Sequence, residues 1–288
     1  ISQFRSSYMK KEFGCLDILK ECCEKSFKKY IRSSLDLEFK GELKKDADQA
    51  AINVFGVNLK NLLLMPYLGA KKVLAIDPGI RTGCKTVIVD ETGKFIEDIV
   101  IYPFPPKNQK TQAKEIIKNL IEKHSIKHIA IGNGTFGRET LQFIEKEVLR
   151  PFKIKCHATM ISEAGASIYS TSAVGRDEFP KLDPTVRGAI SIARRFQDPL
   201  AELVKIDAKS IGVGQYQHDV NQSKLNKSLQ AVVENCVNHV GVDLNTASAS
   251  LLSHISGIGP ILAKNIVKHR EKNGSFKHRE ELMDISRY

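Results

Sequence analysis

The sequence has few features of secreted, membrane-embedded or zinc-binding proteins. Its six cysteines form no C-x-x-C pair, which argues against a structural zinc site and favours buried thiols in a reducing compartment. Its longest apolar runs are far shorter than a membrane-spanning helix, and no basic-then-apolar signal peptide opens the chain. It has no internal repeat and no low-complexity tract. We therefore expect an intracellular protein that does not enter a membrane.

Length and charge allow several domains and favour anionic partners. With 288 residues, of which 42% are apolar, the chain is long enough for two or three domains with real cores. Its formal net charge is +11 at pH 7, and the positive excess is spread along the chain. A positive field of this kind favours polyanions such as nucleic acids. Because the first residue is isoleucine, we expect a segment of a longer protein.

Hydrophobic periodicity divides the chain into three regions. Residues 1–72 have apolar side chains at helical spacing, as in "LDILKECCEKSFKKYI", and predict packing or spacer helices without a site. Residues 73–162 begin with short β-branched segments and predict three strands, helix, strand, helix and strand, which are followed by helices. That order indicates an α/β domain, a mixed sheet with helices on both faces. Residues 163–288 are predicted to be mainly helical.

Three acidic residues stand where predicted strands or helices meet a crevice. Asp77 ends an apolar run in "VLAIDPG", Glu163 follows the last predicted strand in "ISEAGAS", and Asp183 opens a helix in "LDPTVRGA". Two-metal phosphoryl chemistry needs such carboxylates to converge, whereas Asp183 before Pro184 is also an ordinary N-cap. Asn133, at the tip of the fourth strand, is a neutral and poorer ligand for a hard cation. The candidate metal site is therefore incomplete.

The Asp77-Pro-Gly turn by itself is compatible with three uses. RNase H-like nucleases place such an aspartate against a divalent metal, and actin-like sugar kinases place one against ATP phosphates. A tight structural turn needs no ligand at all. The kinase interpretation is the weakest, because the sequence contains no second copy of the aspartate-glycine motif.

A second candidate site lies in "SGIGPILAKNIVKHREKNGSF". Gly257, Ile258 and Gly259 predict a tight turn leading into a helix with proline at its first position. Glycines let the backbone approach a ligand, and the free N–H groups of a helix start attract phosphate. This arrangement predicts contact with a sugar–phosphate backbone without reading of bases. The basic residues that would neutralise neighbouring phosphates are Lys264, Lys268 and Arg270. The alternative is a structural turn between two core helices.

Several segments together resemble the Tex family of transcription accessory proteins. In chain order they are "VLAIDPGIRTGCK", "AIGNGTFGRET", "ISEAGASIYSTS", "DPTVRGAISIARRFQDPLAELVKIDAKSIGVGQYQHDV" and "VGVDLNTASASLL". The resemblance implies the end of a helical N-terminal domain at 1–72 and a YqgF-type, RNase H-like domain at 73–198. It also implies a helical region at 199–288 with a helix-hairpin-helix motif at about 245–288, whose second hairpin is truncated. An S1 RNA-binding domain is expected to follow in the full-length protein.

The resemblance also implies a function. Family members are regarded as nucleic-acid binders without established nuclease activity, so we expect sequence-nonspecific binding of RNA or DNA by a transcription-associated protein. By motif, Asp77, Glu163 and Asp183 correspond to the acids of a resolvase-type site, and Asn133 departs from it. We therefore expect a catalytically silent domain without a cofactor.

Two alternatives stay open, and the expected setting follows from the family. The first alternative is a divalent-metal nuclease using Mg²⁺ or Mn²⁺, and the second is a protein-docking scaffold. The expected partners are RNA or DNA and transcription-machinery or chromatin proteins, with no membrane involved. The expected location is the nucleus in a eukaryote and otherwise the cytoplasm.

Overall fold

The computed structural model describes residues 16–245, 247–274 and 276–285. The chain forms two compact units, Ile1–Asn53 and Val54–Tyr288. The predicted domain boundaries at residues 72 and 198 stay predictions.

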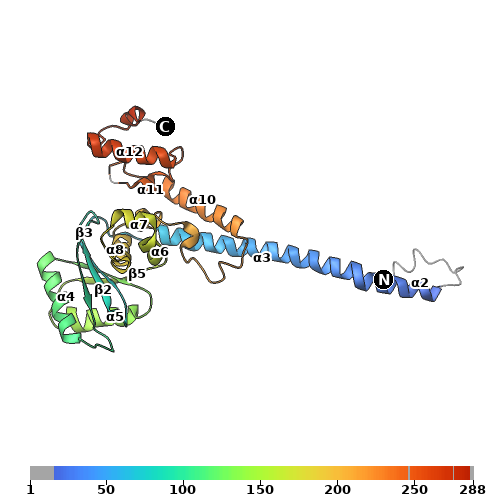
Figure 1. The fold of residues 1–288 in the computed structure, drawn as a ribbon, viewed down its shortest axis with the longest axis horizontal. Helices are drawn as coiled ribbons and strands as arrows, with labels where there is room; N and C mark the ends of the chain where they lie inside the picture. The colour runs from blue at the N-terminus through green and yellow to red at the C-terminus, as the bar shows by residue number, and fades with distance from the viewer. Residues whose placement is uncertain (1–15, 246, 275, 286–288) are drawn as a thin grey trace. The chain divides into compact units, whose positions relative to one another are not determined.

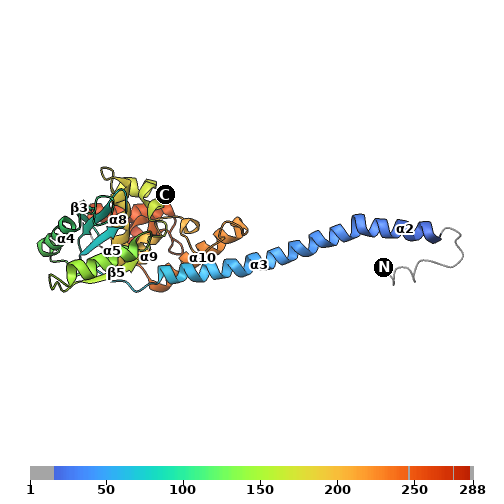
Figure 2. The ribbon, with the colours of Figure 1, turned by 90° about the horizontal axis from the view of Figure 1, so that it is seen from below.

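The first unit is helical where it is described. Its elements are α2 (Leu16–Ser26), the π-helical turn η1 (Phe27–Ile31) and the first part of α3 (Arg32–Leu63), which follow one another without a break (Figure 2). Large apolar side chains such as Leu35, Leu37 and Phe39 are exposed along α3. This part of the helix therefore contributes little to a core, which fits the spacer more than the packing role among the two that its sequence predicts.

The second unit contains a five-stranded mixed sheet in the order β3-β2-β1-β4-β5. The strands are β1 (Val73–Asp77), β2 (Cys84–Val89), β3 (Phe95–Ile101), β4 (His128–Gly132) and β5 (His157–Ile161). Strand β2 is antiparallel to β1 and β3, whereas β4 is parallel to β1 and β5 is parallel to β4. The carboxyl ends of β1, β3, β4 and β5 therefore lie at one edge of the sheet, together with the start of β2.

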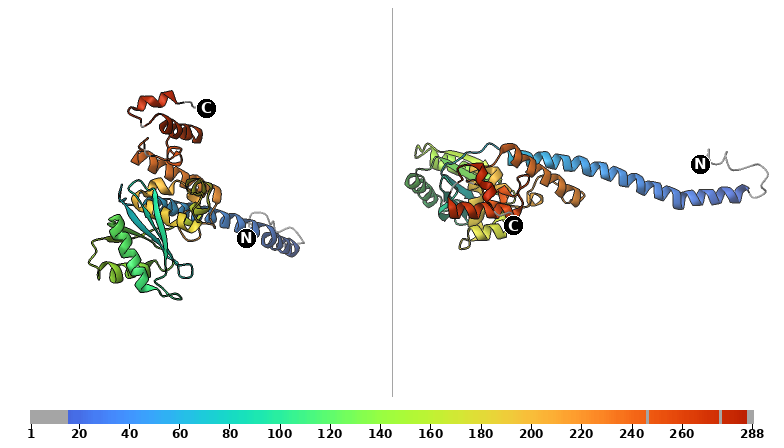
Figure 3. Two further views of the ribbon diagram at one scale, coloured as in Figure 1. Left: turned by 60° about the vertical axis from the view of Figure 1, so that its left-hand side comes forward. Right: turned by 90° about the horizontal axis from the view of Figure 1, so that it is seen from above.

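Helices cover both faces of this sheet, as the sequence predicts (Figures 1 and 3). Those on the sheet are α4 (Lys110–His124), α5 (Gly137–Phe143) with the π-helical turn η2 (Ile144–Leu149), and α8 (Pro184–Gln197). Helix α6 (Ala166–Thr171) contacts α8 and α7 (Ala173–Glu178). Leu74 and Ile76 of β1 pack toward α4, α5 and η2, whereas Val73 and Ala75 pack against α8. Because side chains alternate along a strand, Asp77 lies on the α8 face. The predicted α/β class is confirmed.

The rest of the second unit is helical, also as predicted. Its elements are α9 (Pro199–Leu203), η3 (Ala208–Ser210), α10 (Gln222–Val240), α11 (Ala249–Leu252), α12 (Pro260–Asn273) and η4 (Arg279–Asp284). Helices α11 and α12 contact each other and are drawn in orange-red and red in Figure 1. Residues 275 and 286–288 of the predicted second hairpin lie outside the described residues. None of the helices described is both long and apolar enough to cross a membrane.

Candidate acidic pocket and nucleic-acid interface

Asp77 and Glu163, here together called the acidic pocket, lie at the carboxyl edge of the sheet, on the face covered by α8. The Glu163 carboxylate lies over the loop after β4: a Cβ placed on Gly132 would be 2.7 Å from its Oε2, and one on Gly134 would be 1.8 Å from its Oε1. On α8, a Cβ placed on Gly188 would be 3.9 Å from Asp77 Oδ2. Gly132 and Gly134 therefore leave the space that the Glu163 carboxylate occupies, and Gly188 places α8 in contact distance of Asp77.

These two carboxylates interact through their charges, as the prediction of neighbouring acids requires. Burial, and then the negative charge of Glu163, raise the pKa of Asp77 to about 6, against the opposing influence of the Lys85 ammonium. Both causes penalise the ionised form, because water is withdrawn from the carboxylate and a like charge is close. Asp77 therefore keeps its negative charge at a cost to the stability of the fold.

Asp183 caps a helix. Its Oδ1 accepts hydrogen bonds from the backbone N–H of Thr185 at 2.8 Å and from the Thr185 hydroxyl at 2.6 Å, which confirms the predicted N-cap position before Pro184. These bonds lower the pKa of the Asp183 carboxyl. Throughout the described ranges, no group of three or more His, Cys, Asp or Glu side chains is placed to hold a metal ion. Asp77, Glu163 and Asp183 therefore do not form such a group in the described part of the chain.

The capping role of Asp183 leads to a measurable prediction. Replacing Asp183 with alanine is expected to lower the free energy of unfolding by about 1 kcal/mol at neutral pH, because α8 loses its N-cap. Asparagine caps a helix about as well as aspartate, so Asp183→Asn is the matched control. Urea unfolding followed by circular dichroism measures both variants. Equal losses in the two variants would contradict a capping role.

Asn133 and Arg195 fix the loop that carries Glu163. The Asn133 side-chain oxygen accepts the backbone N–H of Glu163 at 3.1 Å, so it supports the loop from the β4 side. The buried Arg195 donates from one guanidinium nitrogen to the carbonyls of Ser162 at 3.0 Å and Ala164 at 2.6 Å. Glu163 lies between these two anchored residues. No local sequence pattern reveals this role of Arg195, because its partners are backbone groups distant in the chain.

The predicted phosphate-binding turn lies between α11 and α12. Gly257 has a φ of +85°, a left-handed conformation that favours glycine. Gly259 precedes α12, which begins with Pro260 at its first position, as predicted. A Cβ placed on Gly257 or Gly259 would meet no atom within 4 Å, and both glycines are exposed while Ile258 is partly buried. The backbone of this turn is therefore open on its outer side.

The three predicted cations of α12 have different surroundings. Lys264 and Lys268 are exposed and lie one helical turn apart on the same face. Arg270 instead donates from one guanidinium nitrogen to the carbonyls of Leu244 at 2.7 Å and Ala247 at 3.0 Å. It therefore ties α12 to the segment before α11, and its predicted contact with nucleic acid stays a prediction.

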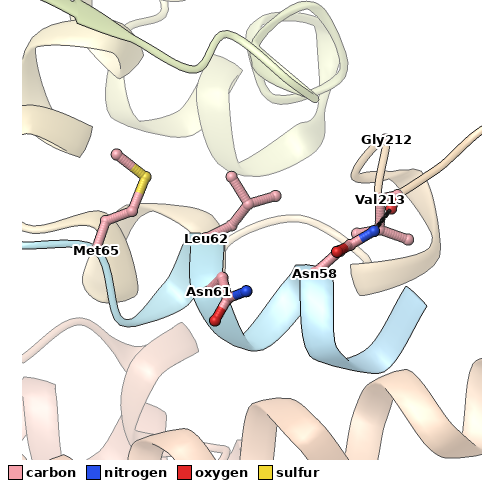
Figure 4. Close-up of a pocket in the computed structure, with 6 residues that line it drawn as sticks. All are labelled: Asn58, Asn61, Leu62, Met65, Gly212 and Val213. Atoms are coloured by element: carbon pink, nitrogen blue, oxygen red, sulfur yellow. Dashed lines mark hydrogen bonds between the residues drawn. The ribbon is translucent and has the colours of Figure 1, made fainter. Parts of the chain in front are cut away.

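A depression elsewhere in the second unit offers no catalytic chemistry. It has a volume of about 360 Å³ and lies between the end of α3 and the loop before α10 (Figure 4). Its lining residues are Asn58, Asn61, Leu62, Met65, Gly212 and Val213. The Asn58 side chain donates a hydrogen bond to the Val213 carbonyl at 2.7 Å and so fixes the loop against α3. None of these six residues has an acidic, basic or strongly nucleophilic side chain.

Known families match the two candidate sites. A family described as the Tex protein YqgF-like domain matches residues 71–197, which include all five strands, Asp77, Glu163 and Asp183. A helix-hairpin-helix motif matches residues 237–287, which include the turn at Gly257 and Gly259.

Curated proteins match most of the chain. The uncharacterized protein YdcI of Bacillus subtilis is 51% identical over 271 residues, which are 94% of this chain and 38% of YdcI. The transcriptional accessory protein Tex of Neisseria gonorrhoeae is 51% identical over 269 residues, 93% of this chain and 35% of that protein. The S1 RNA-binding domain-containing protein 1 of Homo sapiens is 43% identical over 272 residues, 94% of this chain and 27% of that protein. The chain thus spans only about a third of the length of these relatives.

Proposed function

Because this chain is a member of the Tex family, with a YqgF-like domain and a helix-hairpin-helix motif, we propose that it binds RNA or DNA through the sugar–phosphate backbone. The observation that carries this proposal is the open turn at Gly257 and Gly259. It leads directly into α12, so the backbone N–H groups at the start of that helix are accessible to a phosphate. Such contacts position a nucleic acid and do not read its bases.

Charge supports the same proposal. The exposed Lys264 and Lys268 lie on α12 beyond the turn, and the whole chain has a net charge of +11. Each phosphate that a lysine neutralises releases counterions, so binding should weaken as salt rises.

The names of the relatives suggest the setting of the full-length protein. One relative is named a transcriptional accessory protein and another an S1 RNA-binding domain-containing protein. We therefore propose that this chain belongs to a transcription-associated protein whose partners are transcription-machinery or chromatin proteins, in the nucleus of a eukaryote or otherwise in the cytoplasm.

The sheet domain is proposed to be catalytically silent. Asp183 is occupied as a helix cap, and the Asn133 amide holds the Glu163 loop, whereas two-metal cleavage needs several converging carboxylates. The neighbouring pair of Asp77 and Glu163 favours one rival function, a resolvase-type nuclease. Cleavage of branched DNA or structured RNA with Mg²⁺ or Mn²⁺, abolished in Asp77→Asn, would establish that rival.

A double substitution in the turn tests the binding proposal. Gly257→Val/Gly259→Val is expected to weaken binding of single- and double-stranded RNA and DNA at least about tenfold, or about 1.4 kcal/mol. The new side chains would block the approach of a phosphate, and valine at Gly257 would strain the turn. Fluorescence anisotropy at two salt concentrations measures the affinity and its salt dependence.

A second glycine provides the matched control for this experiment. Gly241 follows α10, has a φ of +80° and also has no neighbouring atom within 4 Å of its Cβ position. Gly241→Val therefore introduces the same kind of backbone strain outside the turn, and it should retain affinity. Unchanged binding by the double variant would instead support a protein-docking scaffold.

A further inference from the structure

One basic residue, Lys85, lies opposite an acid of this pocket in the sheet. Lys85 is the partner of Asp77 in the antiparallel pairing of β1 with β2. Directly paired residues project to the same face of a sheet, so the Lys85 side chain lies on the α8 face with the carboxylate of Asp77. The lysine thus occupies the same edge of the sheet as the acids of the predicted metal site.

This ammonium group is held in place by the backbone. Its Nζ donates to the carbonyl oxygens of Thr82 at 2.7 Å and Gly83 at 3.2 Å. Both carbonyls belong to the turn that joins β1 to β2, so this turn holds the positive charge of Lys85 in place. A lysine side chain that makes two such bonds loses the freedom that a solvated lysine keeps.

The charge of Lys85 acts on acids from two elements. It opposes the rise in the pKa of Asp77 that burial and Glu163 cause. It also contributes to the lowering of the pKa of Asp183, whose main cause is hydrogen bonding to Thr185. Lys85 therefore lies within electrostatic range of both acids, on β1 and at the head of α8.

The pocket does not fit the divalent metal of an RNase H-like nuclease. Mg²⁺ and Mn²⁺ are hard cations that need several free oxygen ligands, preferably charged ones. Asp183 Oδ1 already accepts two hydrogen bonds, and the Asn133 oxygen accepts the N–H of Glu163. The Lys85 ammonium, whose charge acts on Asp77, also repels any second cation.

We propose that Lys85 is a built-in counter-cation that keeps divalent metal ions out of the acidic pocket. The proposal rests on the proposed catalytic silence of the sheet domain and gives it a physical cause. Lys85 balances part of the negative charge that would otherwise recruit a metal, so removal of this one charge should open the pocket to Mn²⁺.

The test is a Mn²⁺ titration of the whole chain, with free Mn²⁺ measured by electron paramagnetic resonance. Lys85→Met removes the charge and keeps the length of the side chain, so we expect it to bind Mn²⁺ at least about tenfold more tightly than the unmodified chain. Lys85→Arg keeps the charge and should behave as the unmodified chain does. Lys85→Met/Asp77→Asn removes a ligand and should lose the gained affinity.

Two results would overturn the proposal. One is equal Mn²⁺ affinity in Lys85→Met and the unmodified chain, and the other is tight, Asp77-dependent Mn²⁺ binding by the unmodified chain. If Lys85→Met fails to fold by circular dichroism, Lys85→Gln replaces it, and the titration of the unmodified chain still decides the second point. No nucleic acid is present, so failure of the binding proposal for the Gly257–Gly259 turn would leave this result unaffected.

Discussion

Replacing Asp77 with asparagine is expected to raise the free energy of unfolding by about 2 kcal/mol at pH 8 and to change it little at pH 4. Burial and the charge of Glu163 raise the pKa of Asp77 to about 6 in the folded chain, from an ordinary value of 3.8. Each pKa unit corresponds to about 1.4 kcal/mol, and part of that gain is lost because an amide differs from a protonated carboxyl. Asp77 therefore destabilises the folded chain at every pH at which its carboxyl is ionised.

The pH dependence has a definite sign. Between about pH 4 and pH 7 the folded chain holds a proton on Asp77 that the unfolded chain has released, so stability falls as pH rises through this window. The Asp77→Asn variant lacks this titration. Its free energy of unfolding, relative to that of the unmodified chain, should therefore increase as pH rises from about 4 to 7 and stay constant above that range. Urea unfolding at several pH values measures it.

Asp183→Asn is the opposing control for this experiment. Asp183 has a lowered pKa in the folded chain because of its bonds to Thr185, so its ionised form is favoured by folding and its replacement should give no gain at pH 8. If Asp77→Asn raises the free energy of unfolding as much at pH 4 as at pH 8, the burial of a charged carboxylate is not the cause of the increase.

The sheet and the pairing of two acids could be predicted from sequence because both follow from local patterns. Short β-branched segments separated by an amphipathic helix define strands, and an acid that ends a strand must lie at an edge of the sheet. Asp77 and Glu163 follow two parallel strands of one sheet, so their proximity needed only the correct strand order. The N-cap at Asp183 was equally local, since proline at the next position identifies the start of the helix.

The contacts of Lys85 and Arg270 could not be predicted from the sequence. The position of Lys85 opposite Asp77 depends on the register of β1 and β2, and a shift by one residue would turn the lysine to the other face. Arg270 was predicted as a phosphate ligand because it is basic and follows a glycine turn. Its bonds to the carbonyls of Leu244 and Ala247 depend on tertiary packing, which no local pattern encodes.

Gly83→Ala is expected to have the largest effect on stability, a loss of about 3 kcal/mol. Gly83 has a φ of +82°, and a Cβ placed on it would lie 2.5 Å from ring carbon Cε1 of Tyr102 and 2.5 Å from Cγ1 of Val100. The left-handed backbone costs an alanine about 1–2 kcal/mol, and the overlap with packed side chains costs about 1–3 kcal/mol more. The loss is measured by urea unfolding at neutral pH.

Gly212→Ala is the matched control. A Cβ at Gly212 would meet nothing within 4 Å, so this substitution should change the free energy of unfolding by no more than about 0.5 kcal/mol.

The carbonyl of Gly83 also accepts a hydrogen bond from Lys85. Strain at Gly83 should therefore loosen the fixed ammonium, and Gly83→Ala should bind Mn²⁺ more tightly than Gly212→Ala does. A stable Gly83→Ala chain would show that the turn between β1 and β2 can relax, in which case this turn could not hold the charge of Lys85 rigidly against the acids.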